Sequence, residues 1–214
     1  MDREELKVKI SGGDERVKIA AVTSFLKNNQ QLRDYHFAHK LIYDFEQPPG
    51  KVIKAAILSS FTFDQIQPLL GVESYRSGFP LSVYIGGFNQ YEQEIINPST
   101  QLYEFKPQII LLALRIDDIL PEFRKDFISF NTRTLNLRQK EILENFRRLI
   151  GHIRKNSSAK ILFNNFSYPL FLANGIYEHQ YSKGQLNWID NLNRMLSEMV
   201  QGYSDVYIFD FHYH

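Results

Sequence analysis

The sequence contains no cysteine among its 214 residues. This absence excludes a disulfide-bonded scaffold, a zinc site built from thiolates and a cysteine nucleophile. Long apolar runs are also missing, since no stretch approaches the roughly 18 residues of a membrane-spanning helix. The N-terminus, Met1 to Glu5, is acidic where a signal peptide is basic and then apolar. We therefore expect a soluble, cytoplasmic protein without a membrane partner.

An excess of charge of either sign is missing as well. The chain has 25 basic and 24 acidic residues, which gives a net charge of +1. Binding to a phosphate backbone needs a strongly positive field, so we expect no nucleic-acid partner. With 43% hydrophobic and 23% charged residues, the chain has enough apolar side chain for a globular core.

Glycine-rich phosphate loops do not occur. Gly86 and Gly87 form only a pair, and neither a Walker pattern nor a three-glycine dinucleotide fingerprint is present. No aspartate is followed two positions later by another, so the double-aspartate nucleophile of haloacid-dehalogenase-type phosphatases is missing. His36 and His39 lie one helical turn apart without an apparent third ligand. We expect no nucleotide chemistry, no cofactor and no metal site in this chain.

The first fifty residues have apolar positions at helical spacing and predict a lead-in of two or three helices. The breaker cluster Gln47-Pro48-Pro49-Gly50 marks the predicted junction to the main domain, residues 51–214. From Lys51, β-rich runs alternate with one-sided helical stripes, as in βα units around a parallel sheet. The predicted strands are Val52–Leu58, Leu81–Ile85, Gln108–Leu114, Lys160–Phe163 and Asp205–Phe209. This pattern predicts an α/β, flavodoxin-like doubly wound fold with a five-stranded parallel sheet.

Ser60 follows the first predicted strand, at a strand-to-helix turn. A serine there is placed at the carboxyl edge of the sheet, and free backbone N–H groups of a following helix can stabilise an oxyanion. Ser60 is therefore a candidate nucleophile for acyl transfer. Thr62 and Gln65 also fit a capping box, so the hydroxyls of this loop have an alternative role in turns and caps.

Polar residues follow two further strands. Asp117 and Asp118 come after the third strand, where carboxylates could orient a base or act as one, or could cap a helix. Asn164 and Asn165 come after the fourth, where amides could bind a substrate carbonyl or serve a turn. We expect the Ser60 loop, Gly87, Asp117 and Asn164 to share one cleft.

Three stretches together resemble a known family. They are Ile57-Leu58-Ser59-Ser60-Phe61-Thr62; Phe88-Asn89-Gln90-Tyr91 leading to Phe105-Lys106-Pro107; and Gln108–Leu114 with Asn164-Asn165-Phe166. The sequence resembles the amino-terminal domain of FkbH-like proteins, of the haloacid dehalogenase superfamily, subfamily IIIC. The likeness covers about Lys51 to Phe211.

The resemblance implies an SGNH (GDSL-type) hydrolase-like three-layer sandwich, followed in complete members by a phosphatase-like domain. Because the chain stops soon after a predicted core strand, we expect it to be truncated before that domain. Characterised members load a glyceryl unit onto an acyl carrier protein for polyketide assembly, with chemistry that belongs to the carboxy-terminal domain.

Carried over by residue, the resemblance places Ser60 on the SGNH nucleophile, Gly86 or Gly87 at the oxyanion glycine of those enzymes, and Asp117 where they have an oxyanion asparagine. Leu58 and Ser59 replace the motif glycine and aspartate. The final Asp-x-x-His block is absent, because Asp210 is followed three residues later by Tyr213. The candidate binding residues are Ser59, Thr62, Gly86, Gly87, Asn89, Gln90, Asp117, Asp118, Asn164 and Asn165.

Two hypotheses follow. The first is a binding module that docks an acyl carrier protein or the phosphatase-like domain on a degenerate hydrolase scaffold. The second is a serine acyl-ester hydrolase or acyltransferase with Ser60 as nucleophile. Its general base would come from His179, His212 or a segment beyond His214.

Overall fold

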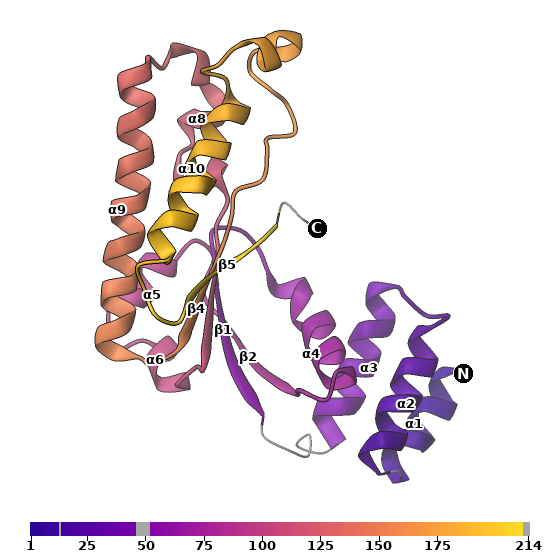
Figure 1. Ribbon diagram of the computed structural model, residues 1–214. Coiled ribbons are helices and arrows are strands. Elements are labelled where there is room, and N and C mark those ends of the chain that lie inside the picture. Colours follow the sequence, from indigo (N-terminus) through magenta and orange to yellow (C-terminus); the bar gives the residue numbers. More distant parts are fainter. Residues whose placement is uncertain (13, 46–51, 212–214) are drawn as a thin grey trace. The chain divides into compact units, whose positions relative to one another are not determined.

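The computed structural model describes residues 1–12, 14–45 and 52–211 (Figure 1). The chain divides into two compact units. Unit 1 comprises Met1–Ala55 and Thr62–Ile85, and unit 2 comprises Ala56–Phe61 and Gly86–His214. The predicted junction Gln47 to Gly50 lies outside the described residues, so a domain division at residue 50 stays a prediction.

Unit 1 is mainly helical, and three helices form over the first 45 residues. Its elements are α1 (Arg3–Gly12), α2 (Glu15–Leu26), α3 (Leu32–Phe45), a 3₁₀ turn η1 (Asp64–Ile66), α4 (Gln67–Arg76) and β2 (Leu81–Ile85). Helix α4 packs on α3 and α2 and adds Val72 and Tyr75 to their apolar core. The helices are stable together because each buries its apolar face against the others.

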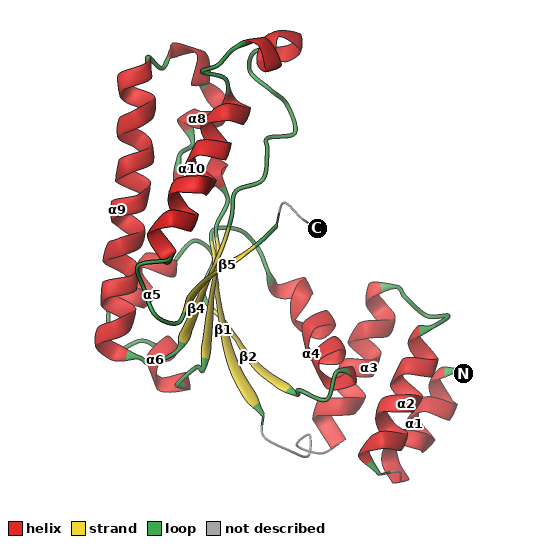
Figure 2. Ribbon diagram, viewed as in Figure 1, coloured by secondary structure: helices red, strands yellow, loops and turns green. Residues whose placement is uncertain are grey.

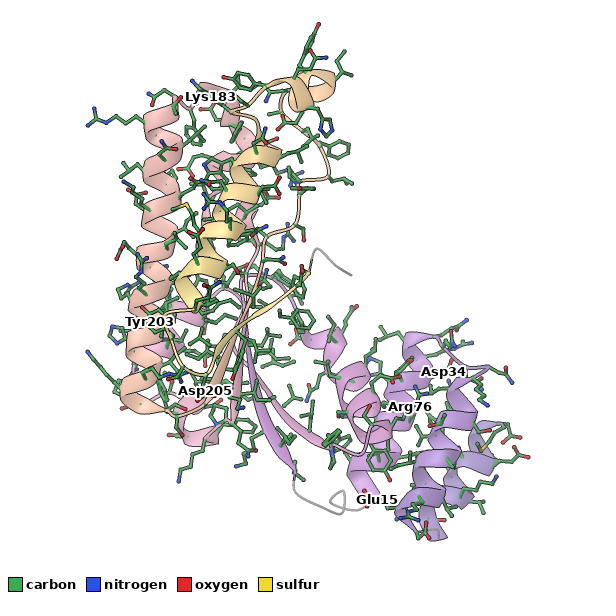
Figure 3. All side chains as sticks on the ribbon, viewed as in Figure 1. Glu15, Asp34, Arg76, Lys183, Tyr203 and Asp205 are labelled. Carbon is green, nitrogen blue, oxygen red and sulfur yellow. The ribbon has the colours of Figure 1, made fainter. Side chains whose placement is uncertain are left out.

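Side-chain caps fix where two of these helices begin. The Asp14 carboxylate accepts a hydrogen bond from the backbone N–H of Val17 at the start of α2. Near the start of α3, Asp34 accepts from the Arg3 guanidinium at 2.8 Å and from the Gln31 N–H at 3.2 Å. Asp34 is labelled in Figure 3. The hydrogen bond from Arg3 holds the pKa of the buried Asp34 carboxyl below its ordinary value.

The sheet has five strands in the order β2-β1-β3-β4-β5 (Figure 2). Besides β2, they are β1 (Ile53–Ser59), β3 (Ile109–Ala113), β4 (Lys160–Asn164) and β5 (Val206–Phe209). Strands β3, β4 and β5 pair in parallel, with Leu111 opposite Leu162 and Leu162 opposite Tyr207. The predicted α/β class with a five-stranded parallel sheet is confirmed, and each strand agrees with its predicted bounds to within one residue.

Helices flank the strands of unit 2. They are α5 (Tyr91–Ile96), α6 (Gln101–Phe105), α7 (Ile116–Ile119), α8 (Glu122–Lys125), α9 (Thr132–Asn156) and α10 (Gln185–Val200), with 3₁₀ turns η2 (Phe127–Ser129) and η3 (Gly175–Gln180). Helices α9 and α10 run side by side and bury the predicted apolar stripes (Figure 1). Rings of Phe146 and Phe163 lie 5.0 Å apart where α9 packs on β4. None of the helices in the described ranges is long and apolar enough to cross a membrane.

Candidate functional site

The carboxyl ends of β1, β3 and β4 are tied together by polar groups from the chain that follows each strand. The Ser60 backbone N–H donates to the Ala113 carbonyl at 3.1 Å. From the other side, the Asn164 amide donates to the Leu114 carbonyl at 2.8 Å and accepts from the Leu114 N–H at 2.7 Å. Both sides of the β3 end are therefore held, and the Asn164 side chain serves the backbone rather than projecting free into a cleft.

The Ser60 hydroxyl is fully engaged. It donates to Asp118 Oδ2 at 2.8 Å and accepts from the Arg115 backbone N–H at 3.0 Å. The residue is only 1% exposed. A nucleophilic hydroxyl must reach its substrate and give its proton to a base as it attacks. In this arrangement the hydroxyl instead connects the end of β1 to the turn that follows β3.

The two aspartates after β3 lie in the first turn of the short helix α7. Arg115 precedes this helix without a side-chain capping bond, so the alternative of an aspartate N-cap is not what the structure shows. The guanidinium of Arg115 is 3.7 Å from Asp118 and 4.0 Å from Asp117. It also lies 5.9 Å from the centre of the Phe61 ring. The carboxylates are therefore held beside a cation at the carboxyl edge of the sheet.

A pocket of about 390 Å³ opens at this edge. Its lining residues are Phe61, Leu114, Arg115, Ile116, Asp117, Asn164, Phe166, Ser167, Tyr168, Pro169, Leu170 and Phe211. Asp117 Oδ1 is buried there and has no hydrogen-bond partner among the described residues. A buried acceptor without a donor is costly, so this oxygen is suited to a ligand hydroxyl, an ammonium group or a water. Aromatic walls beside a guanidinium and a carboxylate suit a ligand with both apolar and polar parts.

Tyr168 closes one side of the pocket and is fixed to α10. Its hydroxyl donates to the Asp190 carboxylate at 2.6 Å. That hydrogen bond, together with burial, raises the pKa of Tyr168 to about 12. Tyr168 is therefore a neutral hydrogen-bond donor over the physiological pH range.

Neither glycine of the predicted oxyanion position has a free N–H group. Gly86 donates to the Ile57 carbonyl at 2.9 Å, and Gly87 donates to the Glu94 carboxylate at 3.0 Å. A Cβ at Gly86 would lie 2.6 Å from Leu58, which explains the need for glycine there. The neighbouring Asn89 has a left-handed backbone with φ of 53°. Asn89 and Gln90 are exposed, and their side chains make no hydrogen bond with the described part of the chain.

The remaining predicted residues serve local structure. The Ser59 hydroxyl donates to the Phe61 carbonyl, and Asn165 links to Asp210 and the Phe211 N–H. Thr62 belongs to unit 1 and is exposed, and neither η1 nor α4 has a side-chain cap. The predicted capping box is absent. The helix after β1 also begins later than expected, because a 3₁₀ turn precedes α4.

No described histidine bonds to the Ser60 hydroxyl. His179 lies in η3, and His212 and His214 lie outside the described residues. In unit 1, His39 stacks on Tyr43 with ring centres 4.5 Å apart. Within the described ranges, no three His, Asp or Glu side chains gather in a way that could hold a metal ion.

Of the predicted site residues, the structure brings Asp117 and Asn164 to one pocket and places Ser60 and Asp118 just behind it. Gly87 is not among the lining residues. Sequence reasoning missed Arg115 and the aromatic walls formed by Phe61, Phe166 and Tyr168. All four residues follow a predicted strand within a few positions. Their place just after a strand could have identified them, because ligands bind beyond the carboxyl ends of such strands.

The model of the family of FkbH N-terminal domains matches residues 56–213. Among curated proteins, the lacticin 481/lactococcin biosynthesis protein LcnDR2 of Lactococcus lactis subsp. lactis is 26% identical over 154 residues. This match covers 66% of the chain but only 16% of that relative. A solved structure, the N-terminal part of the protein BF1531 from Bacteroides fragilis, contains a phosphatase domain complexed with Mg. It has a TM-score of 0.57 and 13% identity over 99% of this chain and 45% of the solved chain. At this identity the likeness shows the fold alone.

Proposed function

Because the chain belongs to the family of FkbH N-terminal domains, we propose that it is a binding module of a biosynthetic protein on a degenerate hydrolase scaffold. In this proposal it docks an acyl carrier protein while an acyl unit of the glyceryl type is loaded, and it packs against a phosphatase-like domain of the same protein. The relation to a lantibiotic biosynthesis protein supports a biosynthetic setting.

The fold supports a scaffold of the SGNH type. The strand order 2-1-3-4-5 is the order of flavodoxin-like sheets, whose ligands bind beyond the carboxyl ends of the strands. Ser60, Asp117 and Asn164 all follow strands at that edge. Fold likeness alone does not carry an activity, so the role depends on the site.

The observation that carries the proposal is that the Ser60 hydroxyl is buried and fully hydrogen-bonded within the protein. Its donor and acceptor functions are both used inside the protein and it is 1% exposed. Beside it lies a pocket with a buried acceptor on Asp117 that lacks a donor among the described residues. The pocket is therefore suited to bind a group, while the serine is not placed to attack one. We assign the pocket to part of the acyl group or its carrier.

The test is calorimetric titration of the 214-residue chain with acyl carrier protein, followed by acyl loading in the longer protein with and without this region. We expect heat of binding and slower loading without the region. Asp117→Leu should weaken binding of the acylated carrier, whereas the matched variant Glu144→Leu, at an exposed carboxylate on α9 outside the pocket, should affect it less. Absence of heat, with equal loading by the shortened protein, would contradict the proposal.

One contact favours a second candidate, an acyl-ester hydrolase or acyltransferase. Asp118 Oδ2 lies 2.8 Å from the Ser60 hydroxyl, within the distance that a general base needs. For this chemistry the serine would have to become accessible and the Arg115 N–H would have to release it. Labelling with a serine-directed probe separates the two candidates.

A further inference from the structure

Unit 2 has a second polar and apolar surface at the N-terminal ends of α9 and α10, away from the lining of the pocket described above. A groove of about 200 Å³ lies there between the two helices. Its lining includes Leu135, Asn136 and Gln139 from α9, Asn187 and Trp188 from α10, and Lys183 from the loop before α10. Lys183 is labelled at this end of the helices in Figure 3.

The loop between β4 and α10 supplies Ser182 and Lys183 to the groove, and it exposes large apolar side chains earlier in its length. Phe171 and Ile176 are 79% and 87% exposed, and Tyr177 is 64% exposed. The loop reaches the groove through Tyr181, whose carbonyl accepts a hydrogen bond from Asn187 at 3.3 Å. Large apolar side chains gathered on one loop mark an interaction surface more often than scattered single residues do.

The base of this loop is held in place by hydrogen bonds from two buried side chains. The buried Glu178 carboxylate accepts hydrogen bonds from the Leu186 N–H at 2.9 Å and from the Asn174 amide at 2.8 Å. Gln185, also buried, bonds to the Ala173 N–H and to the Phe123 carbonyl. The exposed side chains are therefore presented by a fixed framework, which lowers the entropy cost of binding.

The charges at this end are mainly positive. Arg124, Lys125, Arg133 and Lys183 are exposed, and none forms an ion pair with a residue in the described ranges. Two exposed carboxylates, Glu122 and Asp126, lie among them on and just after α8. An acidic partner would supply the missing counter-charges.

We propose that this groove and its loop dock an acidic amphipathic helix of a partner protein. Two parallel rows of helix side chains form a groove in which a third helix can lie. The partner's carboxylates would pair with Lys183 and Arg133 and accept hydrogen bonds from Asn136 and Asn187. Its apolar face would cover Phe171 and Ile176. The groove volume admits one or two inserted side chains, so the rest of the helix would lie on the surface.

An anionic lipid surface fits these residues less well. Its headgroups can accept hydrogen bonds, but a bilayer surface has no side chains that could insert between α9 and α10. It would also be repelled by Glu122 and Asp126, whereas a protein can match charges of both signs. The inference does not depend on the pocket beside Ser60 and stands apart from the proposed function.

The chain contains a single tryptophan, Trp188, and it lines the groove. Its emission therefore reports occupation of this site. The 214-residue chain is titrated with three probes: a synthetic helical peptide with glutamates on one face and leucines on the other, the same peptide with lysines for glutamates, and phosphatidylserine vesicles. We expect the acidic peptide to bind in calorimetry and to shift Trp188 emission, and the other two probes to do neither.

Variants sharpen the test. Lys183→Glu combined with Arg133→Glu should weaken binding of the acidic peptide by about tenfold or more, because two attractions become repulsions. Phe171→Ser with Ile176→Ser should weaken it similarly. Lys155→Glu is the matched control, since Lys155 is exposed in the last turn of α9, about 33 Å along the helix from Arg133 at 1.5 Å per residue. The control should retain binding.

Three results overturn the proposal. One is failure of the acidic peptide to bind, and another is equal binding of the lysine peptide. The third is binding of the acidic peptide that the charge reversals leave unchanged. Vesicle binding in place of peptide binding would assign the surface to lipid.

Discussion

Two regions of unit 2 use polar groups in opposite ways. At the carboxyl ends of the strands, Ser60 and Asn164 are buried. The Ser60 hydroxyl bonds to the Asp118 carboxylate and the Arg115 N–H, and the Asn164 amide bonds to the Leu114 backbone. At the N-terminal ends of α9 and α10, Lys183 and Arg133 are exposed and unpaired within the described residues, beside highly exposed apolar side chains. The polar groups of the first region have hydrogen-bond partners within the chain, whereas the two cations of the second have no ion-pair partner among the described residues.

The two regions should differ in what the removal of a polar group changes, which distinguishes the scaffold from a binding surface. Polar groups in the first region gain their bonds on folding, so their removal should lower stability. Exposed groups in the second region gain little on folding, so their removal should leave stability unchanged and alter binding. The pocket with Asp117 lies next to the first region but shares a property with the second, because the Asp117 Oδ1 acceptor has no donor in the part of the chain that the structure describes.

The largest expected effect concerns the support beneath the exposed loop. Phe123 is completely buried, with its ring 4.8 Å from Trp188 and 5.2 Å from Phe127. Phe123→Ala should lower the free energy of unfolding by about 3–5 kcal/mol through the lost burial and the cavity. Urea denaturation followed by Trp188 emission measures it. Phe171→Ala, on the exposed loop, should change stability by less than about 0.5 kcal/mol. Comparable losses of stability in the two variants would contradict the distinction between the buried support at Phe123 and the exposed surface at Phe171.

A smaller loss is expected at Ser60. Ser60→Ala removes the donor to Asp118 and leaves the Arg115 N–H without its acceptor, at a cost of about 1–3 kcal/mol. Ser167→Ala, at an exposed serine of the pocket, is the matched control and should cost little. A double-mutant cycle with Asp118→Asn should give a coupling energy of about 0.5–3 kcal/mol. Additive effects would show that the hydroxyl does not join β1 to α7.

Two glycines of unit 2 should respond in opposite directions. A methyl group at Gly184 would overlap the carboxylate of the buried Glu178, so Gly184→Ala should cost about 1–3 kcal/mol by overpacking. Gly151 lies within α9 and a Cβ there meets open space, so Gly151→Ala should stabilise by about 0.5–1 kcal/mol. Thermal denaturation of both variants measures the pair. If Gly184→Ala leaves stability unchanged, Gly184 is not packed tightly against Glu178, and the claim that the base of the exposed loop is rigid is wrong.

The smallest effect is a titration at the pocket wall. The folded-state pKa of Tyr168 is about 12, above the ordinary 10.0, because of its hydrogen bond to Asp190. The neutral tyrosine is favoured in the folded state. Its stabilising contribution is therefore present below pH 10 and is lost as pH rises toward 12. The difference in ultraviolet titration between the wild type and Tyr168→Phe should have its midpoint near 12. In Asp190→Asn that midpoint should move toward 10, and a midpoint already near 10 in the wild type would contradict the contact.

The fold class was predictable because strands buried among helices have continuous apolar runs, and the helices on the sheet have one-sided stripes. Ile110 and Leu112 of β3 and Ile161 and Phe163 of β4 show this, as do the stripes of α9 and α10. Helix starts were less predictable. The Thr62-Gln65 pattern does not form a capping box, since a 3₁₀ turn precedes α4.

The candidate site was predictable only in outline. Asp117 and Asn164 reach one pocket because parallel strands end at one edge of the sheet. The engagement of Ser60 by Asp118, 58 positions away in the chain, depends on tertiary packing that no local pattern encodes. The same holds for the donation of the Gly87 N–H to Glu94, which removes it as an oxyanion donor.

The claim that Ser60 is part of the scaffold and not a nucleophile is tested most directly by a fluorophosphonate probe. The probe is applied to the chain and to its Ser60→Ala variant, and labelled serines are identified by mass spectrometry. The account predicts that Ser60 remains unlabelled. Labelling of the wild type at Ser60 that disappears in Ser60→Ala would contradict it and would favour the acyl hydrolase.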